Sequence, residues 1–142
     1  MKEIGVINGR KILYQRCNDT LGWSTHLPDE KWLLLAIVEN CGKEFLIEIA
    51  NISILKNVCY VCGVGHQGEL LHDITDELRD VKDHVFIMTT WHDSLDDGLW
   101  FSLFAAQNDE EDILTVVCLD VARLPLYEEI AVILSEICKK TL

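Results

Sequence analysis

An α/β domain with a mostly parallel sheet is the fold class that this 142-residue sequence predicts. Its short apolar runs are continuous rather than alternating, which is typical of parallel strands buried on both faces. Each run is followed by a segment with helical periodicity, and a helix is the usual crossover between two parallel strands. Apolar residues make up 49% of the chain, which is ample for a core. The runs are residues 32–38, 58–62, 84–90 and 113–119.

We therefore expect one domain over residues 1–142, a three-layer sandwich with helices on both faces of the sheet. It divides into a β-hairpin at 1–16, an irregular loop at 17–31 and four β-α units at 32–142. Four core strands with right-handed crossovers fit a flavodoxin-like or half-Rossmann topology. Periodicity carries no information on which strands are neighbours, so no strand order is predicted.

The hairpin is predicted from Asn8-Gly9, which lies between strands at 4–7 and 11–14. A two-residue type I′ turn needs positive φ at both central residues, and Asn-Gly supplies both. The loop that follows holds Trp23 among polar residues. We interpret Trp23 as a plug packed against one edge of the sheet; the alternative is that the loop is a lid.

Helices are expected at 43–56 and 69–82, and a last helix begins near Pro125. A further helix begins with Ser94 and Asp97 in the Ser-x-x-Asp capping pattern, and its apolar face extends to Phe104. Gly98 within it costs about 1 kcal/mol relative to alanine. A glycine tolerated at that cost often allows a close approach, but the sequence does not identify the group that approaches.

The charge of the chain excludes two classes of partner. Asp and Glu number 24 against 12 Lys and Arg, a formal net charge of −12. Nucleic acids and anionic membranes are bound by basic surfaces, so neither is expected as a partner. The charge either serves solubility alone or attracts a basic partner protein. No apolar run approaches the roughly 20 residues that span a bilayer, and the N-terminus has no apolar signal core, so we expect a cytoplasmic protein.

The six cysteines are expected to be reduced thiols. Cys59, Cys62 and Cys118 lie in apolar runs, where a cysteine packs as a small hydrophobic residue. Without a secretion signal, disulfides are not expected. Cys62 and His66, with the neighbouring His92-Asp93, could supply metal ligands, but their spacing offers no compact pair. We therefore predict no metal site.

Gly63, Gly65 and Gly68 match the G-x-G-x-x-G pattern of dinucleotide sites, directly after a strand and before a helix. Such glycines let the backbone approach a pyrophosphate at a helix N-terminus. However, the strand is not the first of the fold, and Glu69 places a carboxylate where phosphate would lie. We interpret the pattern as a glycine-rich turn between strand and helix, and expect no cofactor.

Trp91, His92 and Asp93 mark the most informative place in the sequence, where an apolar run ends and a helix begins. Open α/β sheets bind ligands at the carboxyl ends of their strands. Trp91 can stack on a ligand or partner, His92 can act as an acid, base or hydrogen-bond donor, and Asp93 adds negative charge. The alternative is structural, with Trp91 packed against the next helix and Asp93 helping to cap it. The other candidates at strand ends are Glu39, His66 and Asp120.

Residues 89–101, TTWHDSLDDGLWF, resemble part of a group of small, uncharacterised bacterial α/β domains. In that group a Thr-Trp-His strand exit leads into a helix that bears Leu-Trp-Phe. The resemblance covers about the last two thirds of the chain. It implies the α/β fold and brings no known activity with it.

Two functions from different classes fit these observations. The first is a non-enzymatic acidic binding module, such as an immunity or antitoxin-like protein that masks a basic partner. The lack of a recognisable catalytic set favours a protein that is not an enzyme. The second is a small-molecule-binding or hydrolytic α/β domain that uses a cleft at the strand ends, around His66, His92 and Asp120.

Overall fold

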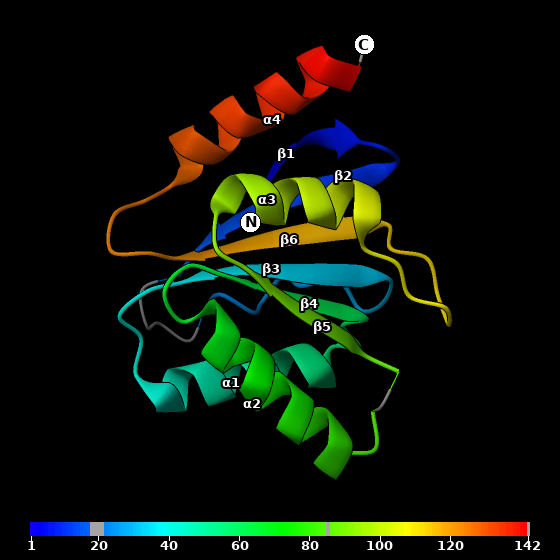
Figure 1. Ribbon diagram of the computed structural model, residues 1–142. Coiled ribbons are helices and arrows are strands. Elements are labelled where there is room, and N and C mark those ends of the chain that lie inside the picture. Colours follow the sequence, from blue (N-terminus) through cyan, green and yellow to red (C-terminus); the bar gives the residue numbers. More distant parts are fainter. Residues whose placement is uncertain (18–21, 85, 142) are drawn as a thin grey trace.

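A single sheet lies at the centre of the computed structural model, which describes residues 1–17, 22–84 and 86–141 (Figure 1). The strands of the described chain are β1 (Lys2–Ile7), β2 (Arg10–Arg16), β3 (Trp32–Val38), β4 (Tyr60–Val64), β5 (Met88–His92) and β6 (Thr115–Val121). Their order across the sheet is β1-β2-β6-β3-β4-β5. β1 pairs antiparallel with β2, and every other neighbouring pair is parallel. The predicted α/β fold with a mostly parallel sheet is therefore confirmed.

The predicted N-terminal hairpin is also confirmed, and it belongs to the main sheet. Asn8 and Gly9 have φ angles of 53° and 74°, the positive values that the type I′ turn needs. β2 lies parallel to β6, so the sheet extends beyond the four strands that the apolar runs mark. The sequence does not predict this extension because β2, RKILYQR, mixes polar and apolar residues and does not resemble a buried parallel strand.

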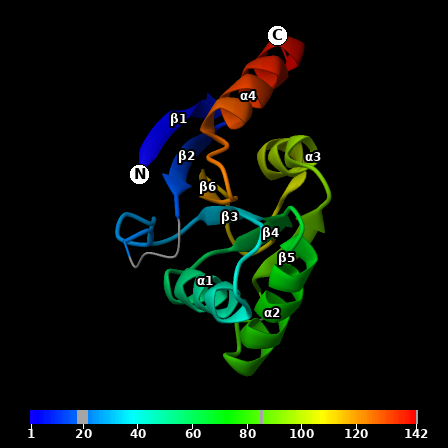
Figure 2. The same ribbon diagram turned by 90° about the vertical axis from the view of Figure 1, so that its left-hand side faces the viewer.

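Helices lie on both faces of the sheet (Figure 2). They are α1 (Lys43–Leu55), α2 (Gly68–Val81), α3 (Leu95–Trp100), its π-helical continuation η1 (Phe101–Ala105) and α4 (Tyr127–Thr141). The buried side chains of α1 and α2 share a core with Leu34, Val61 and Val117 of the sheet. Those of α3, η1 and α4 share a second core with Leu35 and Cys118. No helix in the described ranges is long and apolar enough to cross a membrane.

Three strands begin and end later than their apolar runs predict. The sequence places them at 58–62, 84–90 and 113–119, whereas the structure has β4, β5 and β6 at 60–64, 88–92 and 115–121. Val58, Ile87 and Ile113 are buried connections that precede these strands. Hydrophobicity reports burial, whereas the ends of a strand depend on backbone pairing. Trp91 and His92 consequently lie inside β5 rather than beyond it.

The loop after β2 carries Trp23, which is only 2% exposed. Trp23 is buried, as the plug interpretation predicts, but it belongs to the same core as the buried side chains of α1, on one face of the sheet rather than at an edge strand. Residues 18–21 of the predicted loop, and residue 85 of the predicted third strand, lie outside the described residues.

The start of α3 confirms the predicted cap. Ser94 Oγ accepts a hydrogen bond from the backbone N–H of Asp97 at 3.2 Å. Gly98 lies close against the sheet, since a Cβ there would lie 2.5 Å from Val64 Cγ2 and 3.3 Å from Leu35 Cδ1. α3 therefore sits directly on β3 and β4 because position 98 has no side chain.

The hairpin holds the end of this helix, where the π-helical segment η1 continues α3. Asn8 Nδ2 donates to the carbonyl of Leu103 at 2.8 Å, and Arg10 Nη2 donates to that of Ala106 at 2.7 Å. Carbonyls near the end of a helix need partners from outside it. Side chains from the N-terminus of the chain supply them.

Gly63 and Gly68 lie against each other where the first turn of α2 passes β4. A Cβ on Gly63 would lie 2.3 Å from the carbonyl oxygen of Gly68, and a Cβ on Gly68 would lie 2.8 Å from the carbonyl carbon of Gly63. Gly65 between them has φ of 94°, a conformation that favours glycine. Close packing of helix on strand and a left-handed turn therefore account for all three glycines.

We expect Gly63→Ala to lower the free energy of unfolding by about 3 kcal/mol, because rigid backbone rather than a flexible side chain blocks the added methyl group. Gly5→Ala is the matched control, since a Cβ there meets no atom within 4 Å. Urea unfolding followed by circular dichroism measures both variants. Equal stabilities would contradict the close contact between Gly63 and Gly68.

Candidate functional site

A polar pocket at the carboxyl ends of the strands brings together three of the six predicted residues. It has a volume of about 630 Å³ and is lined by Glu39, Asn40, Gly65, His66 and Asp93. These residues follow β3, β4 and β5, which are parallel neighbours. The carboxyl ends of the three strands therefore lie side by side at the same end of the sheet. We call this the strand-end pocket.

The two turns that line the strand-end pocket brace each other. The side chain of Gln67 accepts a hydrogen bond from Cys41 N–H at 2.7 Å and donates one to the Cys41 carbonyl at 2.8 Å. The backbone N–H of Gln67 donates to the carbonyl of Val38 at 3.1 Å. A Cβ on Gly65 would lie 3.1 Å from that same carbonyl oxygen. Glu39 and His66 are thus carried on turns with defined relative positions.

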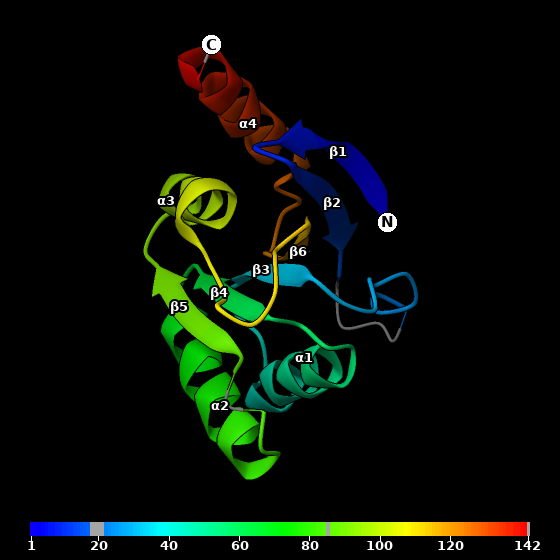
Figure 3. The same ribbon diagram turned by 90° about the vertical axis from the view of Figure 1, so that its right-hand side faces the viewer.

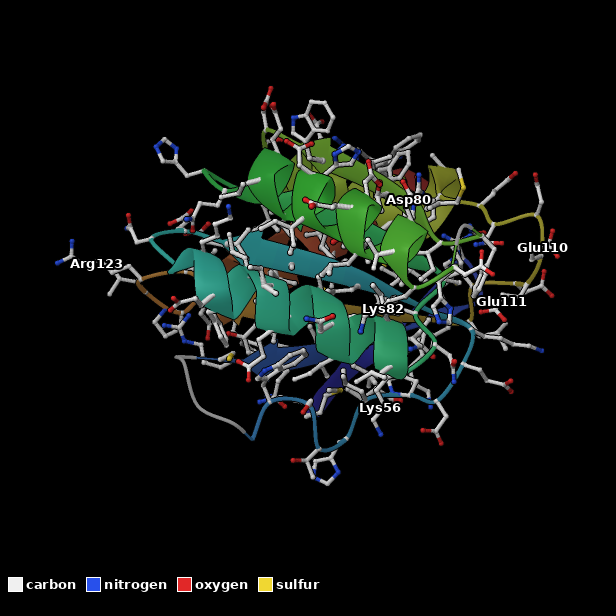
Figure 4. The ribbon with its side chains drawn as sticks, turned by 90° about the horizontal axis from the view of Figure 1, so that it is seen from below. Lys56, Asp80, Lys82, Glu110, Glu111 and Arg123 are labelled. Carbon is white, nitrogen blue, oxygen red and sulfur yellow. The ribbon has the colours of Figure 1, made fainter. Side chains whose placement is uncertain are left out.

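A second pocket, of about 430 Å³, lies between the ends of β3 and β6. It shares Glu39 and Asn40 with the strand-end pocket, and it adds two arginines from elements far away in the sequence. We call it the β3–β6 pocket. Figure 4 shows Arg123 at this end of the molecule and Glu110 and Glu111 at the opposite end. The remaining residues that line the pocket are Arg16, Cys17, Cys41, Val121, Ala122 and Arg123.

Asp120, another predicted site residue, lies inside β6 and is fully buried. Its carboxylate accepts hydrogen bonds from Tyr14 Oη at 2.6 Å and from the backbone N–H groups of Ala122 and Leu126 at 3.0 and 2.7 Å. Arg16 forms an ion pair with it, with Arg16 Nη1 3.2 Å from Asp120 Oδ1. Burial, and then the bond to Asp120, raise the pKa of Tyr14, which keeps the phenol protonated as a donor. Asp120 therefore lines neither pocket and instead organises the structure beside them.

Trp91 and His92 point to opposite faces of β5, as neighbours along a strand do. The Trp91 ring packs on His72 of α2, with centroids 4.9 Å apart, and Trp91 is still 44% exposed. The His92 ring packs on Phe101, with centroids 4.6 Å apart. Burial lowers the pKa of His92, while the negative charges of Asp97 and Asp93 act to raise it by a smaller amount. β3 and β4 lie between β5 and β6, so His92 and Asp120 are three strand spacings of about 4.8 Å apart. They do not share a site.

Three core thiols are unsuited to nucleophilic attack. Burial is the main cause that raises the pKa of Cys59 and Cys118 to about 12 and that of Cys62 to about 11. These thiols are protonated near neutral pH, and a protonated thiol is a poor nucleophile. Among the residues that the structure describes, no group of three or more His, Cys, Asp or Glu side chains could hold a metal ion.

A groove between α3 and α4 is a feature that the sequence analysis missed. It has a volume of about 430 Å³, and Trp100, Val132, Ile133 and Ile137 supply its apolar surface. In α4 apolar residues occupy more than one face, and Val132 is 61% exposed. That excess of apolar residues over one buried face is the sequence signal for the groove. The charged residues that line it are Asp96, Asp97, Glu136 and Lys140.

The comparisons with known proteins give a family and no activity. A family model described as "Domain of unknown function (DUF7684)" matches residues 13–137. No curated protein and no solved structure matches the chain. The matched range agrees with an uncharacterised domain, as the resemblance implies, and it includes the residues of both pockets. The Thr-Trp-His signature stays a prediction.

We expect Tyr14→Phe to lower the free energy of unfolding by about 2 kcal/mol, since a buried carboxylate loses one of its donors. Tyr127→Phe is the control, because it removes the neighbouring hydroxyl and keeps the ring, whose centroid lies 5.1 Å from that of Tyr14. Urea unfolding measures both variants. A Tyr14→Phe variant as stable as Tyr127→Phe would show that the bond to Asp120 contributes nothing.

Proposed function

Because the chain belongs to the DUF7684 family, whose description assigns no activity, we propose a function from the geometry: a non-enzymatic acidic module that binds and masks a basic partner protein. Immunity and antitoxin-like proteins work in this way. The observation that carries the proposal is the groove between α3 and α4, where an apolar surface is bordered by carboxylates.

The composition of the groove favours a basic amphipathic helix as its occupant. Trp100 is 54% exposed and Val132 61% exposed beside the groove, and exposed apolar side chains grouped together are typical of interaction sites. A helix that lays its apolar face into such a groove is a recurrent mode of recognition. A shallower pocket beside it, lined in part by Glu128 and Glu129, continues the acidic border. Among the described residues that line the groove, only Lys140 is basic.

The charge of the whole chain supports the same kind of partner. A formal net charge of −12 creates a field that accelerates association with a basic protein and opposes association with an acidic one. An attraction of this kind is screened by salt, with a Debye length of about 8 Å at physiological ionic strength. Binding through the groove should therefore weaken as salt is added.

A second candidate function, binding of a small anionic molecule, is favoured by the strand order. Counted in chain order from β3, the neighbouring strands β5, β4, β3 and β6 have the order 3-2-1-4. This is the order of strands in half of a Rossmann sheet. In such sheets the ligand binds where the direction of the connections reverses, which here is between β3 and β6. The β3–β6 pocket, with Arg16 and Arg123, lies at that point.

We expect the protein to bind a fluorescein-labelled amphipathic Leu/Lys helical peptide and not the Leu/Glu peptide with the same apolar face. The double variant Glu129→Gln, Glu136→Gln should bind the Leu/Lys peptide about fivefold more weakly, because one carboxylate of the groove and one of the pocket beside it are lost. Fluorescence anisotropy measures the dissociation constants.

The matched control is Glu110→Gln, Glu111→Gln, which makes the same change in net charge in a loop away from the groove. This control should bind the Leu/Lys peptide as the unaltered chain does. An equal loss in both double variants would mean that net charge alone attracts the peptide. Equal binding of the Leu/Lys and Leu/Glu peptides would reject a basic partner.

For the second candidate function, ATP, NAD or inorganic phosphate should raise the midpoint of thermal unfolding by about 3 °C. Arg123→Ala should abolish the shift, because it removes a cation from the β3–β6 pocket. Lys82→Ala, which removes a cation near the end of α2 (Figure 4), should leave it intact. A flat response of the unaltered chain to all three compounds would reject this function.

A further inference from the structure

The two edges of the sheet differ in how they are protected. β1 carries Lys2 and Glu3 and has an irregular register between Glu3 and Gly5. Charges and irregularities of this kind prevent an edge strand from pairing with another chain. β5, at the opposite edge, has the sequence MTTWH, with no proline, lysine or carboxylate. Figure 3 shows β5 at the outer side of the sheet.

The backbone of β5 has hydrogen-bonding groups that face outward. Met88 N–H donates to the carbonyl of Cys59, so the backbone N–H and C=O groups of Met88 point toward β4. In a parallel pair the residues that face the neighbour alternate along the strand. The backbone N–H and C=O groups of Thr90 and His92 therefore point toward β4, and those of Thr89 and Trp91 point away from it. No strand of the described chain pairs with this side of β5.

The side chains along β5 present an apolar and aromatic surface. Trp91 is 44% exposed on the face that α2 covers, where it packs on His72. Met88 is 45% exposed and lies on the other face, two residues before Thr90. Aromatic residues and methionine are enriched in protein–protein interfaces. An exposed edge with these side chains is suited to pairing with a further strand.

The charge beside β5 decides between a second copy and a basic partner. The side chains of Asp73 and Asp80 on α2 are 63% and 65% exposed, and Arg79, whose Nε lies 3.6 Å from Asp80, offsets only one of the acidic charges of this helix. Asp76, between them along the helix, accepts a hydrogen bond from Thr89 Oγ1, which ties this acidic helix to β5. Two copies paired through β5 would bring two such α2 helices together, and like charges repel. Charge complementarity therefore favours a partner with basic side chains.

We propose that the outer edge of β5 binds an extended basic segment of a partner protein as a seventh strand of the sheet. Side chains of the added strand alternate between the two faces. Those on the α2 side are basic, meet Asp73 and Asp76, and place a cation over the exposed Trp91 ring. Those on the other side are apolar and contact Met88. The edge uses the backbone and does not require the groove between α3 and α4, so either surface can be tested without the other.

The probe for this proposal is a peptide of alternating Lys and Val, with a Glu/Val peptide and an N-methylated Lys/Val peptide for comparison. The Lys/Val peptide should bind, and it should newly protect the backbone N–H groups of Thr89 and Trp91 from hydrogen–deuterium exchange, measured by NMR. The two comparison peptides should do neither, because one has the wrong charge and the other cannot form the strand ladder.

Trp91→Lys should weaken binding of the Lys/Val peptide about tenfold, since it places a repelling charge on the edge and removes the ring. Trp100→Lys is the matched control, because Trp100 is also an exposed tryptophan but lies on α3. This control should bind the Lys/Val peptide as the unaltered chain does. The Leu/Lys helical peptide, used as a second probe, should still bind Trp91→Lys, which separates this proposal from the groove.

Several outcomes would overturn the proposal. One is binding of the Lys/Val peptide without protection of Thr89 and Trp91. Equal binding by Trp91→Lys and Trp100→Lys would also overturn it, as would equal binding of the Lys/Val and Glu/Val peptides. If the protein alone protects these two N–H groups increasingly with its own concentration, the occupant is a second copy and the basic partner is wrong.

Discussion

A buried carboxylate joins the N-terminal hairpin to the rest of the sheet. Asp120 on β6 accepts hydrogen bonds from Tyr14 on β2 and from backbone N–H groups in the connection to α4, and Arg16 balances its charge. A buried charge without such partners costs several kcal/mol, so β2, β6 and the start of α4 are restricted to one arrangement. The β3–β6 pocket lies beside this network, with Arg16 in both.

Some of the carboxylates of this acidic chain lie next to exposed apolar side chains. Trp100 is exposed at a groove with Asp96 and Asp97, and Trp91 is exposed next to the carboxylates of α2. Carboxylates alone serve solubility. Carboxylates that border exposed aromatic residues are suited to a basic partner that also has apolar residues, because burial of the rings supplies affinity and charge supplies selectivity. The groove would recognise side chains of a helix, whereas the β5 edge would recognise the backbone of a strand.

Three of the six residues singled out in the sequence line one pocket. Glu39, His66 and Asp93 meet in one pocket because parallel strands end at the same edge, a consequence that the order of apolar runs already implies. Asp120 also lies near the end of an apolar run, but its hydrogen-bond partner Tyr14 is 106 residues away in the chain, and no local pattern reveals that pairing. Val132 has the same apolar character as a core residue, so its exposure at the groove is invisible in the sequence.

Local patterns in the sequence determined the turn at Asn8-Gly9, the cap at Ser94 and the succession of strands and helices, because each depends on residues a few positions apart. Only the tertiary structure decided that β6 lies between β2 and β3 and that β5 is left at an edge. Strand order depends on contacts between segments distant along the chain. Only the tertiary structure decided, too, which tryptophans are buried, as Trp23 is, and which face solvent, as Trp91 and Trp100 do.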